Sequence, residues 1–283
     1  LSSPLTDSDI SDWDNEIFLS MDPSCPDGEV VGGDGPFRSV YYFTENTATW
    51  NAVTNCTEPL VSARGYEIWL GTDIANISAT TLTTGAQVGG TPAKGSIAAT
   101  VTRVVDGWNL VGNPYPAAFS WPLLRADVAS WSNLDNLFQI YDQTISDYAV
   151  YDGATPGNST GQLLGSGGIV SSTQGFWVHS TSGSPTLTFK ETHKSATTTR
   201  PLVKLMMPFE DNSMHILIHT DMMKNASESV INFMDGESAA YKDIDAPYMQ
   251  SKDKKTPSIT PLSEDGKKLR IYKLDGNKST MTI

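Results

Sequence analysis

The chain has 283 residues, a formal net charge of −13 and 39% apolar residues. The acidic balance argues against nucleic acid as a partner, because phosphate binding needs clustered Lys and Arg, and it argues equally against an anionic membrane surface. The sequence holds no apolar run long enough for membrane insertion. Abundant Gly, Pro, Ser and Thr favour many short strands joined by turns over long helices.

The first 36 residues are rich in Asp, Ser, Pro and Gly and predict an extended N-terminal segment. Asp7, Asp9, Asp12 and Asp14 bring four carboxylates close together in the sequence, and hard oxygen ligands suit Ca²⁺. The Gly and bidentate Glu positions of an EF-hand are missing, so an acidic solvated segment is the favoured interpretation and calcium the weak alternative. No other cofactor is expected.

The two cysteines of the chain are Cys25 and Cys56. In an extracellular protein one disulfide between them is the natural pairing. It would close a loop of about thirty residues and stabilise the fold by about 3 kcal/mol through the entropy of the unfolded chain. Two unpaired thiols are the alternative, and we favour the disulfide.

Strands dominate the rest of the expected secondary structure, because many stretches are rich in β-branched and aromatic residues. These stretches are residues 38–43, 96–103, 137–141, 185–189, 214–220 and 229–233. One short helix is expected, with Ser120 as its N-cap and Pro122 in its first turn. Leu123, Leu124 and Val128 would share one face of that helix.

A faint internal repeat links two distant segments. Residues 62–70, SARGYEIWL, resemble residues 172–180, STQGFWVHS. Each segment has a turn, a Gly, an aromatic residue and then a β-branched residue two places on. A Gly at the start of a strand permits a bulge or a positive φ. The repeat is consistent with two hairpins packed in one sandwich.

The stretch GWNLVGNPYP, residues 107–116, predicts a strand that ends in a rigid corner. Its side chains alternate, so that Asn109 and Val111 lie on the opposite face from Trp108. The two prolines fix φ and remove two backbone donors. Asn109 and Asn113 can satisfy the backbone groups that this leaves without partners.

The stretch contains no nucleophile and no useful acid or base at neutral pH. We therefore interpret it as a folding device rather than as a ligand site. The residues of this structural corner are Trp108, Asn109, Gly112, Asn113, Pro114, Tyr115 and Pro116.

The composition changes near residue 200. All seven Trp lie before it and eight of the nine Met lie after it. Residues 1–200 hold 8 Lys and Arg against 20 Asp and Glu, whereas residues 201–283 hold 11 against 12. We therefore predict an all-β protein with two consecutive β-sandwich domains, jelly-roll or Ig-like. The predicted parts are an extended N-terminal segment at 1–36, a sandwich with the corner at 37–190, a linker at 191–200 and a smaller sandwich at 201–283.

Three blocks carry a resemblance to a known family. They are GWNLVGNPYP, QGFWV at residues 174–178 and DGKKLRI at residues 265–271. They resemble the β-sandwich region upstream of the sorting domain in Bacteroidetes surface proteins that the type IX secretion system exports. One departure is Pro247 after Asp245-Ala246, where that family usually has an aromatic residue. The resemblance implies secretion and a place on the cell surface, but no reaction.

We therefore expect a non-catalytic structural or adhesive module of a secreted bacterial surface protein, located outside the cell. Its partners would be other surface-protein domains or copies of itself in a fibre, with Leu1–Pro36 and Lys268–Ile283 pairing with open sheet edges of a neighbour. The alternative is a carbohydrate-binding accessory module of a secreted glycan-degrading enzyme, which would bind polysaccharide on exposed coplanar rings. The candidate rings are Trp50, Trp69, Trp131 and Trp177.

Overall fold

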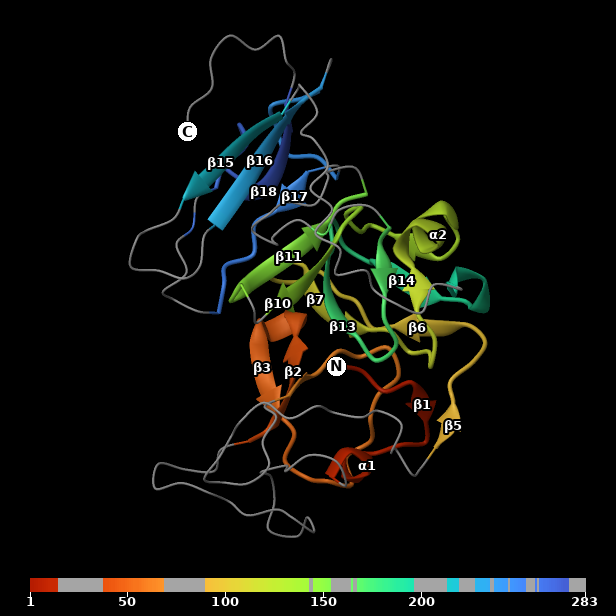
Figure 1. Cartoon of the computed structure of the whole chain (residues 1–283). Coiled ribbons are helices and arrows are strands. Elements are labelled where there is room, and N and C mark those ends of the chain that lie inside the picture. The colour runs from red at the N-terminus through yellow and green to blue at the C-terminus, as the bar shows by residue number, and fades with distance from the viewer. Residues whose placement is uncertain are drawn as a thin grey trace, which may run out of the picture. The chain divides into compact units, whose positions relative to one another are not determined.

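A computed structural model describes residues 1–14, 38–68, 90–142, 145–153, 164, 167–195, 213–218, 227–234, 237–243, 245–252, 258 and 260–274. Within these residues the fold is all-β, with short strands in mostly antiparallel sheets and two short α-helices (Figure 1). The all-β sandwich class predicted from the sequence is confirmed. The chain divides into two compact units, residues 1–133 with 169–200 and residues 134–168 with 201–283.

The first unit contains most of the described strands, and many of them are only two residues long. Its strands are β1 (Leu5–Thr6), β2 (Val40–Thr44), β3 (Thr49–Ala52), β4 (Glu67–Ile68), β5 (Thr91–Pro92), β6 (Ile97–Ala99), β7 (Trp108–Gly112), β8 (Phe119–Ser120), β9 (Trp131–Ser132), β12 (Ile169–Val170), β13 (Gly175–His179) and β14 (Thr186–Phe189). Its helices are α1 (Ser11–Asp14), α2 (Trp121–Ala126) and the 3-10 turns η1 (Glu45–Thr47) and η3 (Glu191–His193).

Aromatic rings from several strands form the centre of the first unit. The Phe176 ring of β13 lies 5.7 Å from the Phe119 ring of β8 and 6.4 Å from the Phe189 ring of β14, and all three residues are fully buried. Trp121 of α2 packs edge-on against Phe176 at 6.0 Å. Since β13 pairs with β7 and β14 pairs with β6 and β9, these rings pack one sheet against another, as in a sandwich.

The two copies of the sequence repeat lie on opposite edges of β7. On one edge, the amide N–H of Gly112 donates to the carbonyl of Ala63, at 3.0 Å, and on the other edge β13 pairs with β7 in antiparallel register. Ala63 and Thr173, which occupy equivalent positions in the repeat, both have positive φ, at 60° and 61°. The repeat therefore encodes the same turn twice, in a conformation that non-glycine residues rarely adopt.

The predicted helix is α2, and most of its expected details are present. The Ser120 hydroxyl accepts a hydrogen bond from the Leu123 amide at 3.4 Å, and Leu124 is fully buried. The expected shared face is wrong, because Leu123 is 48% exposed and Val128 is 78% exposed. The helix ends at Ala126, so Val128 lies beyond its last turn.

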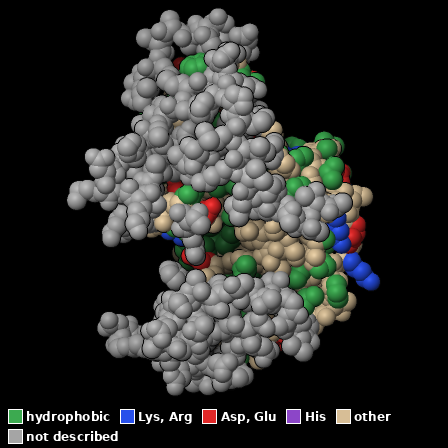
Figure 2. Space-filling model, in the orientation of Figure 1, with side chains coloured by type: hydrophobic (Ala, Val, Ile, Leu, Met, Phe, Trp, Pro, Cys, Tyr) green, Lys and Arg blue, Asp and Glu red, His purple; other side chains and the backbone are tan. Residues whose placement is uncertain are grey.

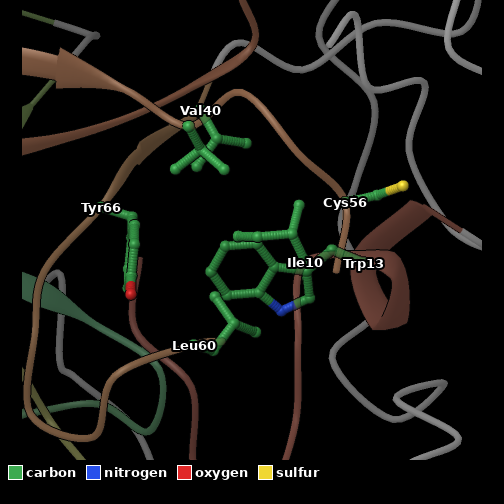
Figure 3. Close-up of a cluster of buried hydrophobic side chains, with 7 residues drawn as sticks. Ile10, Trp13, Val40, Cys56, Leu60 and Tyr66 are labelled. Atoms are coloured by element: carbon green, nitrogen blue, oxygen red, sulfur yellow. The ribbon is translucent and has the colours of Figure 1, made fainter. Parts of the chain in front are cut away.

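The start of the chain is not the extended lead-in that the composition predicts. The Leu1 carbonyl accepts the Tyr66 amide at 2.7 Å, and β1 pairs with β5. Ile10 and Trp13, just before and within helix α1, pack against buried residues of other segments (Figure 3). The polar composition misled the prediction, because it does not show which apolar side chains distant segments will cover. Residues 15–37 lie outside the described part of the chain.

The second unit has a hairpin and a four-stranded sheet. Its strands are β10 (Phe138–Asp142), β11 (Asp147–Tyr151), β15 (Ser213–Ile218), β16 (Ser227–Phe233), β17 (Ala246–Pro247) and β18 (Leu269–Leu274). Strands β10 and β11 pair antiparallel, and the sheet has the order β15-β16-β18-β17. The pairing of β16 with β18 is parallel, which the sequence analysis did not anticipate.

The unit boundaries differ from the predicted ones. Residues 134–168 belong with residues 201–283, although they lie inside the predicted first domain. Two buried ion pairs join the β11 region to β18, since Asp147 pairs with Arg270 and Asp152 with Lys273. Part of the predicted linker at 191–200 is also structured, because η3 spans Glu191–His193. Residues 196–200 of that linker lie outside the described part of the chain.

Candidate functional site

The GNPYP corner is held by the side chain of Asn113, which is fully buried. Its Nδ2 donates to the carbonyls of Ala117 and Ser171, both at 2.9 Å, and its Oδ1 accepts the amide of Tyr115 at 3.0 Å. The Tyr115 hydroxyl donates to the Gly95 carbonyl at 2.6 Å, which ties the corner to the loop before β6. The asparagine therefore satisfies backbone groups at the corner, as the sequence predicts.

Asn109 does the same at the other end of β7. Its Oδ1 accepts the Thr102 amide at 2.8 Å, and its Nδ2 donates to the carbonyls of Thr102 and Gly107, both at 2.9 Å. The described X-Pro bonds are all trans. Asn109 and Asn113 thus join backbone segments at the two ends of β7.

Gly112 and Gly175 pair with each other in the register of β7 and β13, and the first residues of the chain lie across them. A Cβ at Gly112 would lie 2.1 Å from the Cβ of Ser2, and a Cβ at Gly175 would lie 3.0 Å from backbone atoms of Leu1. The Ser2 hydroxyl donates to the Asn113 carbonyl at 2.7 Å. These two glycines are required because another backbone approaches closely there.

The most unusual group in the first unit is Glu45, which is 3% exposed. Its carboxylate accepts the amides of Val104, Val105 and Gly107 at 2.9, 2.7 and 3.0 Å and the hydroxyl of Thr102 at 2.9 Å. Burial acts to raise the pKa of Glu45, but these hydrogen bonds outweigh it and hold the pKa below its ordinary value. A single carboxylate therefore holds the whole turn of residues 102–107.

That turn presents two adjacent valines to solvent. Val104 is 67% exposed and Val105 is 53% exposed, although valine normally favours strands over turns. On the described part of one face, hydrophobic side chains occur in several separate groups (Figure 2). We call residues 102–107 the Glu45 turn. Its fixed backbone and its apolar tip make it the candidate contact site of the first unit.

Three aromatic rings, from strands β2, β3 and β13, form a cluster, and two of them lie close in the chain to Glu45. The rings of Phe43, Trp50 and Trp177 contact one another at 5.0 to 5.8 Å, and each pair is edge-on, with interplanar angles of 67° to 85°. Trp50 is 38% exposed, whereas Trp177 is 6% exposed. Rings in this arrangement do not form the coplanar platform that sugar stacking requires.

The other two tryptophans proposed for sugar binding, Trp69 and Trp131, do not add a stacking surface to this ring cluster within the described residues. The guanidinium of Arg125 stacks over the Trp131 ring, 3.2 Å from the ring centroid. Nε1 of Trp131 donates a hydrogen bond to the Arg125 carbonyl at 2.9 Å. Trp69 lies outside the described residues. The tryptophans proposed for polysaccharide binding are therefore not brought together as a flat surface within the described part of the chain.

A second polar cluster joins α2 to η3. Asp127 Oδ2 lies 2.7 Å from Lys190 Nζ, 2.8 Å from the Ser130 hydroxyl and 3.2 Å from His193 Nε2. The hydrogen bond from Lys190 is the largest of the effects that hold the pKa of Asp127 well below its ordinary value. His193 Nδ1 accepts the Lys190 amide at 3.1 Å, so both ring nitrogens are engaged. The cluster resembles a catalytic dyad in composition, yet its histidine has no nitrogen left for a substrate.

The aspartates of the weak calcium candidate act on their own backbone. Asp9 Oδ1 accepts the Ser11 amide at 2.9 Å, and Asp12 Oδ2 accepts the Asp9 amide at 3.1 Å, which caps helix α1. Asp7 is exposed, and the side chain of Asp14 is outside the described part. Among the described residues no group of three or more His, Cys, Asp or Glu side chains has the geometry to hold a metal.

The described residues include Cys56, one of the two cysteines of the predicted disulfide. Cys56 is disulfide-bonded and lies in the buried cluster with Ile10 and Trp13 (Figure 3). Cys25 is the chain's other cysteine and falls outside the described residues. The buried cluster therefore includes a residue that forms a disulfide bond.

The second unit also contains buried carboxylates, and one of them is Asp245. Asp245 is 1% exposed, and its oxygens accept the amides of Lys273 and Lys242 at 2.7 and 2.8 Å. Burial is the main effect, and it raises the pKa of Asp245 to about 6 despite these hydrogen bonds. The folded state therefore binds this proton more tightly than the unfolded chain, whose Asp has a pKa of about 4.

We expect Asp245 to make the second unit less stable as the pH rises. Its contribution is fully present below about pH 4 and is lost as the pH rises to about 6, by about 2 kcal/mol. Protection factors of the β18 amides, measured by hydrogen exchange with intrinsic rates divided out, are expected to fall over this range. Asp245→Asn is expected to abolish the dependence. Asp265→Asn is the control, since the pKa of Asp265 is lowered instead, mainly by the Ser263 hydroxyl. A wild-type slope of the opposite sign would contradict this assignment.

Sequence reasoning missed Glu45 and Asp245. Glu45 lies two residues after the predicted strand 38–43, and nothing in its neighbours indicates that a turn more than 50 residues later uses its carboxylate. Asp245 lies where the sequence departs from the family that it resembles, and its burial depends on β18. Long-range partners of this kind leave no local pattern in the sequence.

Comparison with known protein families identifies a match over most of the chain. Residues 31–267 match the family described as Domain of unknown function (DUF8693). No curated protein and no solved structure shows a significant match. No helix among the described residues is long and apolar enough to cross a membrane. Since the match covers most of the chain, the protein belongs to the Domain of unknown function (DUF8693) family.

Proposed function

We propose that this chain is a non-catalytic structural or adhesive module of a secreted bacterial surface protein. The observation that carries the proposal is the Glu45 turn. A buried carboxylate holds four donors, and the turn exposes the apolar pair Val104 and Val105 next to Asp106. A fixed turn with two exposed valines suits contact with another surface.

The polar clusters support the same proposal. Asn109 and Asn113 satisfy backbone groups, and His193 has both ring nitrogens engaged by its own chain. The edge-on arrangement of Trp50 and Trp177 favours protein contact over sugar stacking. The described parts of both terminal segments pair within their own chain, in β1 and β18, so the proposal does not extend to strand donation.

The experiment that tests the proposal uses intact cells that make the protein. The chain is expected to be digested by protease added outside the cells, and its deletion is expected to reduce attachment of the cells to surfaces or to each other. Return of the wild-type gene should restore attachment, whereas a Val104→Asp, Val105→Asp variant that reaches the surface at the same level should not. Protection of the chain from added protease, or full restoration by the variant, would overturn the proposal. Retention on insoluble polysaccharides would indicate the carbohydrate-binding alternative.

A further inference from the structure

The second unit contains a buried lysine beside a buried carboxylate. Lys273 Nζ lies 3.2 Å from Asp152 Oδ2, and the two side chains are 7% and 3% exposed. Lys273 is on β18, and Asp152 directly follows β11, so the pair joins two segments that are far apart in the chain. Lysine is rarely buried to this extent, because its ammonium loses its hydration.

Two further observations show that the surroundings of this pair are shielded from water. Asp245, which accepts the Lys273 amide at 2.7 Å, has a pKa raised to about 6 chiefly by burial. The neighbouring pair of Arg270 and Asp147 is also buried, with both side chains 1% exposed. The contact of 3.2 Å between Lys273 Nζ and Asp152 Oδ2 allows a proton to pass from the lysine to the carboxylate, and this transfer gives the neutral amine and neutral acid that amide formation requires.

We propose that Lys273 and Asp152 are the site of an intramolecular amide bond. After proton transfer, the lone pair of Lys273 Nζ attacks Cγ of Asp152 and a bond forms between these atoms. The bond between Cγ and the hydroxyl oxygen breaks, and the hydroxyl leaves as water with a proton from the nitrogen. No oxidant, reductant or further reactant is needed. This inference goes beyond the proposed function and does not depend on it.

The same unit supplies two internal comparisons. Arg270 and Asp147 are also buried, with Nη2 and Oδ2 2.9 Å apart, but a guanidinium is not a nucleophile that forms amides. Lys242 Nζ and Glu237 Oε2 are as close, at 2.9 Å, but the lysine side chain is 44% exposed and reaches solvent. Only the pair of Lys273 and Asp152 combines a lysine, a carboxylate and burial among the described ion pairs.

The proposal is tested by the mass of the intact, denatured and reduced chain. The wild-type protein is expected to be lighter than its sequence by one water molecule, trypsin should not cleave after Lys273, and fragmentation should show one peptide carrying both residues. Lys273→Arg keeps a cation and should have the full sequence mass. Lys242→Arg is the matched control and should still lack one water.

Formation of a succinimide at Asp152-Gly153 would also release one water molecule, so the experiment must distinguish a succinimide from the proposed amide. Mild base hydrolyses a succinimide and restores the full mass, whereas the amide survives, and a succinimide would persist in Lys273→Arg. A wild-type chain of full mass with cleavage after Lys273 would overturn the proposal. Persistence of the water loss in Lys273→Arg would overturn it as well.

Discussion

Replacement of Glu45 by Gln is expected to lower the free energy of unfolding of the first unit by about 3 kcal/mol. The carboxylate accepts hydrogen bonds from Thr102, Val104, Val105 and Gly107, and it is almost fully buried. Glutamine has one acceptor oxygen and no charge, so its NH₂ group would face amide donors. The loss is large because buried donors left without an acceptor are not compensated by water.

Tryptophan fluorescence during chemical denaturation measures this loss, because all seven tryptophans lie in residues 1–133 and 169–200. The pKa of Glu45 is lowered in the folded state, so its contribution is present above about pH 4.5 and is lost as the pH falls below that value. The difference between wild type and Glu45→Gln should therefore shrink in acid. Glu264→Gln, at an exposed position, should change neither unit measurably. A difference that does not vary with pH would show that the charge of Glu45 is unimportant.

Replacement of Gly112 by Ala is expected to destabilise the first unit by about 2–3 kcal/mol. The added Cβ would lie 2.1 Å from the Cβ of Ser2 and 2.9 Å from the carbonyl oxygen of Arg64. To make room, the start of the chain must move away from β7 and β13. It would then lose the bonds from Ser2 to the carbonyls of Thr173 and Asn113, at 2.9 and 2.7 Å.

Two variants separate the proposed clash from a general effect of alanine. Gly183→Ala should be close to neutral, because no atom beyond its chain neighbours lies within 4 Å of the Cβ position there. Adding Ser2→Gly to Gly112→Ala should recover part of the lost stability, since it removes the side chain that the new methyl meets. Faster proteolysis at the first residues of Gly112→Ala is also expected. Equal losses in Gly112→Ala and Gly183→Ala would contradict the packing explanation.

Several parts of the fold were predictable because their causes are local. Alternating β-branched and aromatic residues predicted β2, β7 and β13, and Ser120 with Pro122 predicted α2. The repeat predicted two equivalent turns, which Ala63 and Thr173 adopt. Periodicity, capping and turn chemistry act over a few residues, so these features can be inferred without tertiary contacts.

The site and the unit boundaries were not predictable in the same way. Residues 1–14 were expected to be extended on their composition, yet Ile10 and Trp13 are buried against segments that come much later in the chain. Residues 134–168 were placed in the first domain by chain order, but Asp147 and Asp152 pair with Arg270 and Lys273. No local pattern indicates which distant cation a given aspartate will contact.

The sequence by itself determined the all-β class, the positions of several strands and the corner at residues 107–116, because each depends on neighbouring residues. The tertiary structure alone decided that Glu45 holds residues 102–107, that Gly112 and Gly175 lie beneath the start of the chain, and that Lys273 meets Asp152. The physical reason is that burial and close approach are properties of segments brought together by folding. A carboxylate, a glycine or a lysine acquires its role only from the partner that folding places beside it.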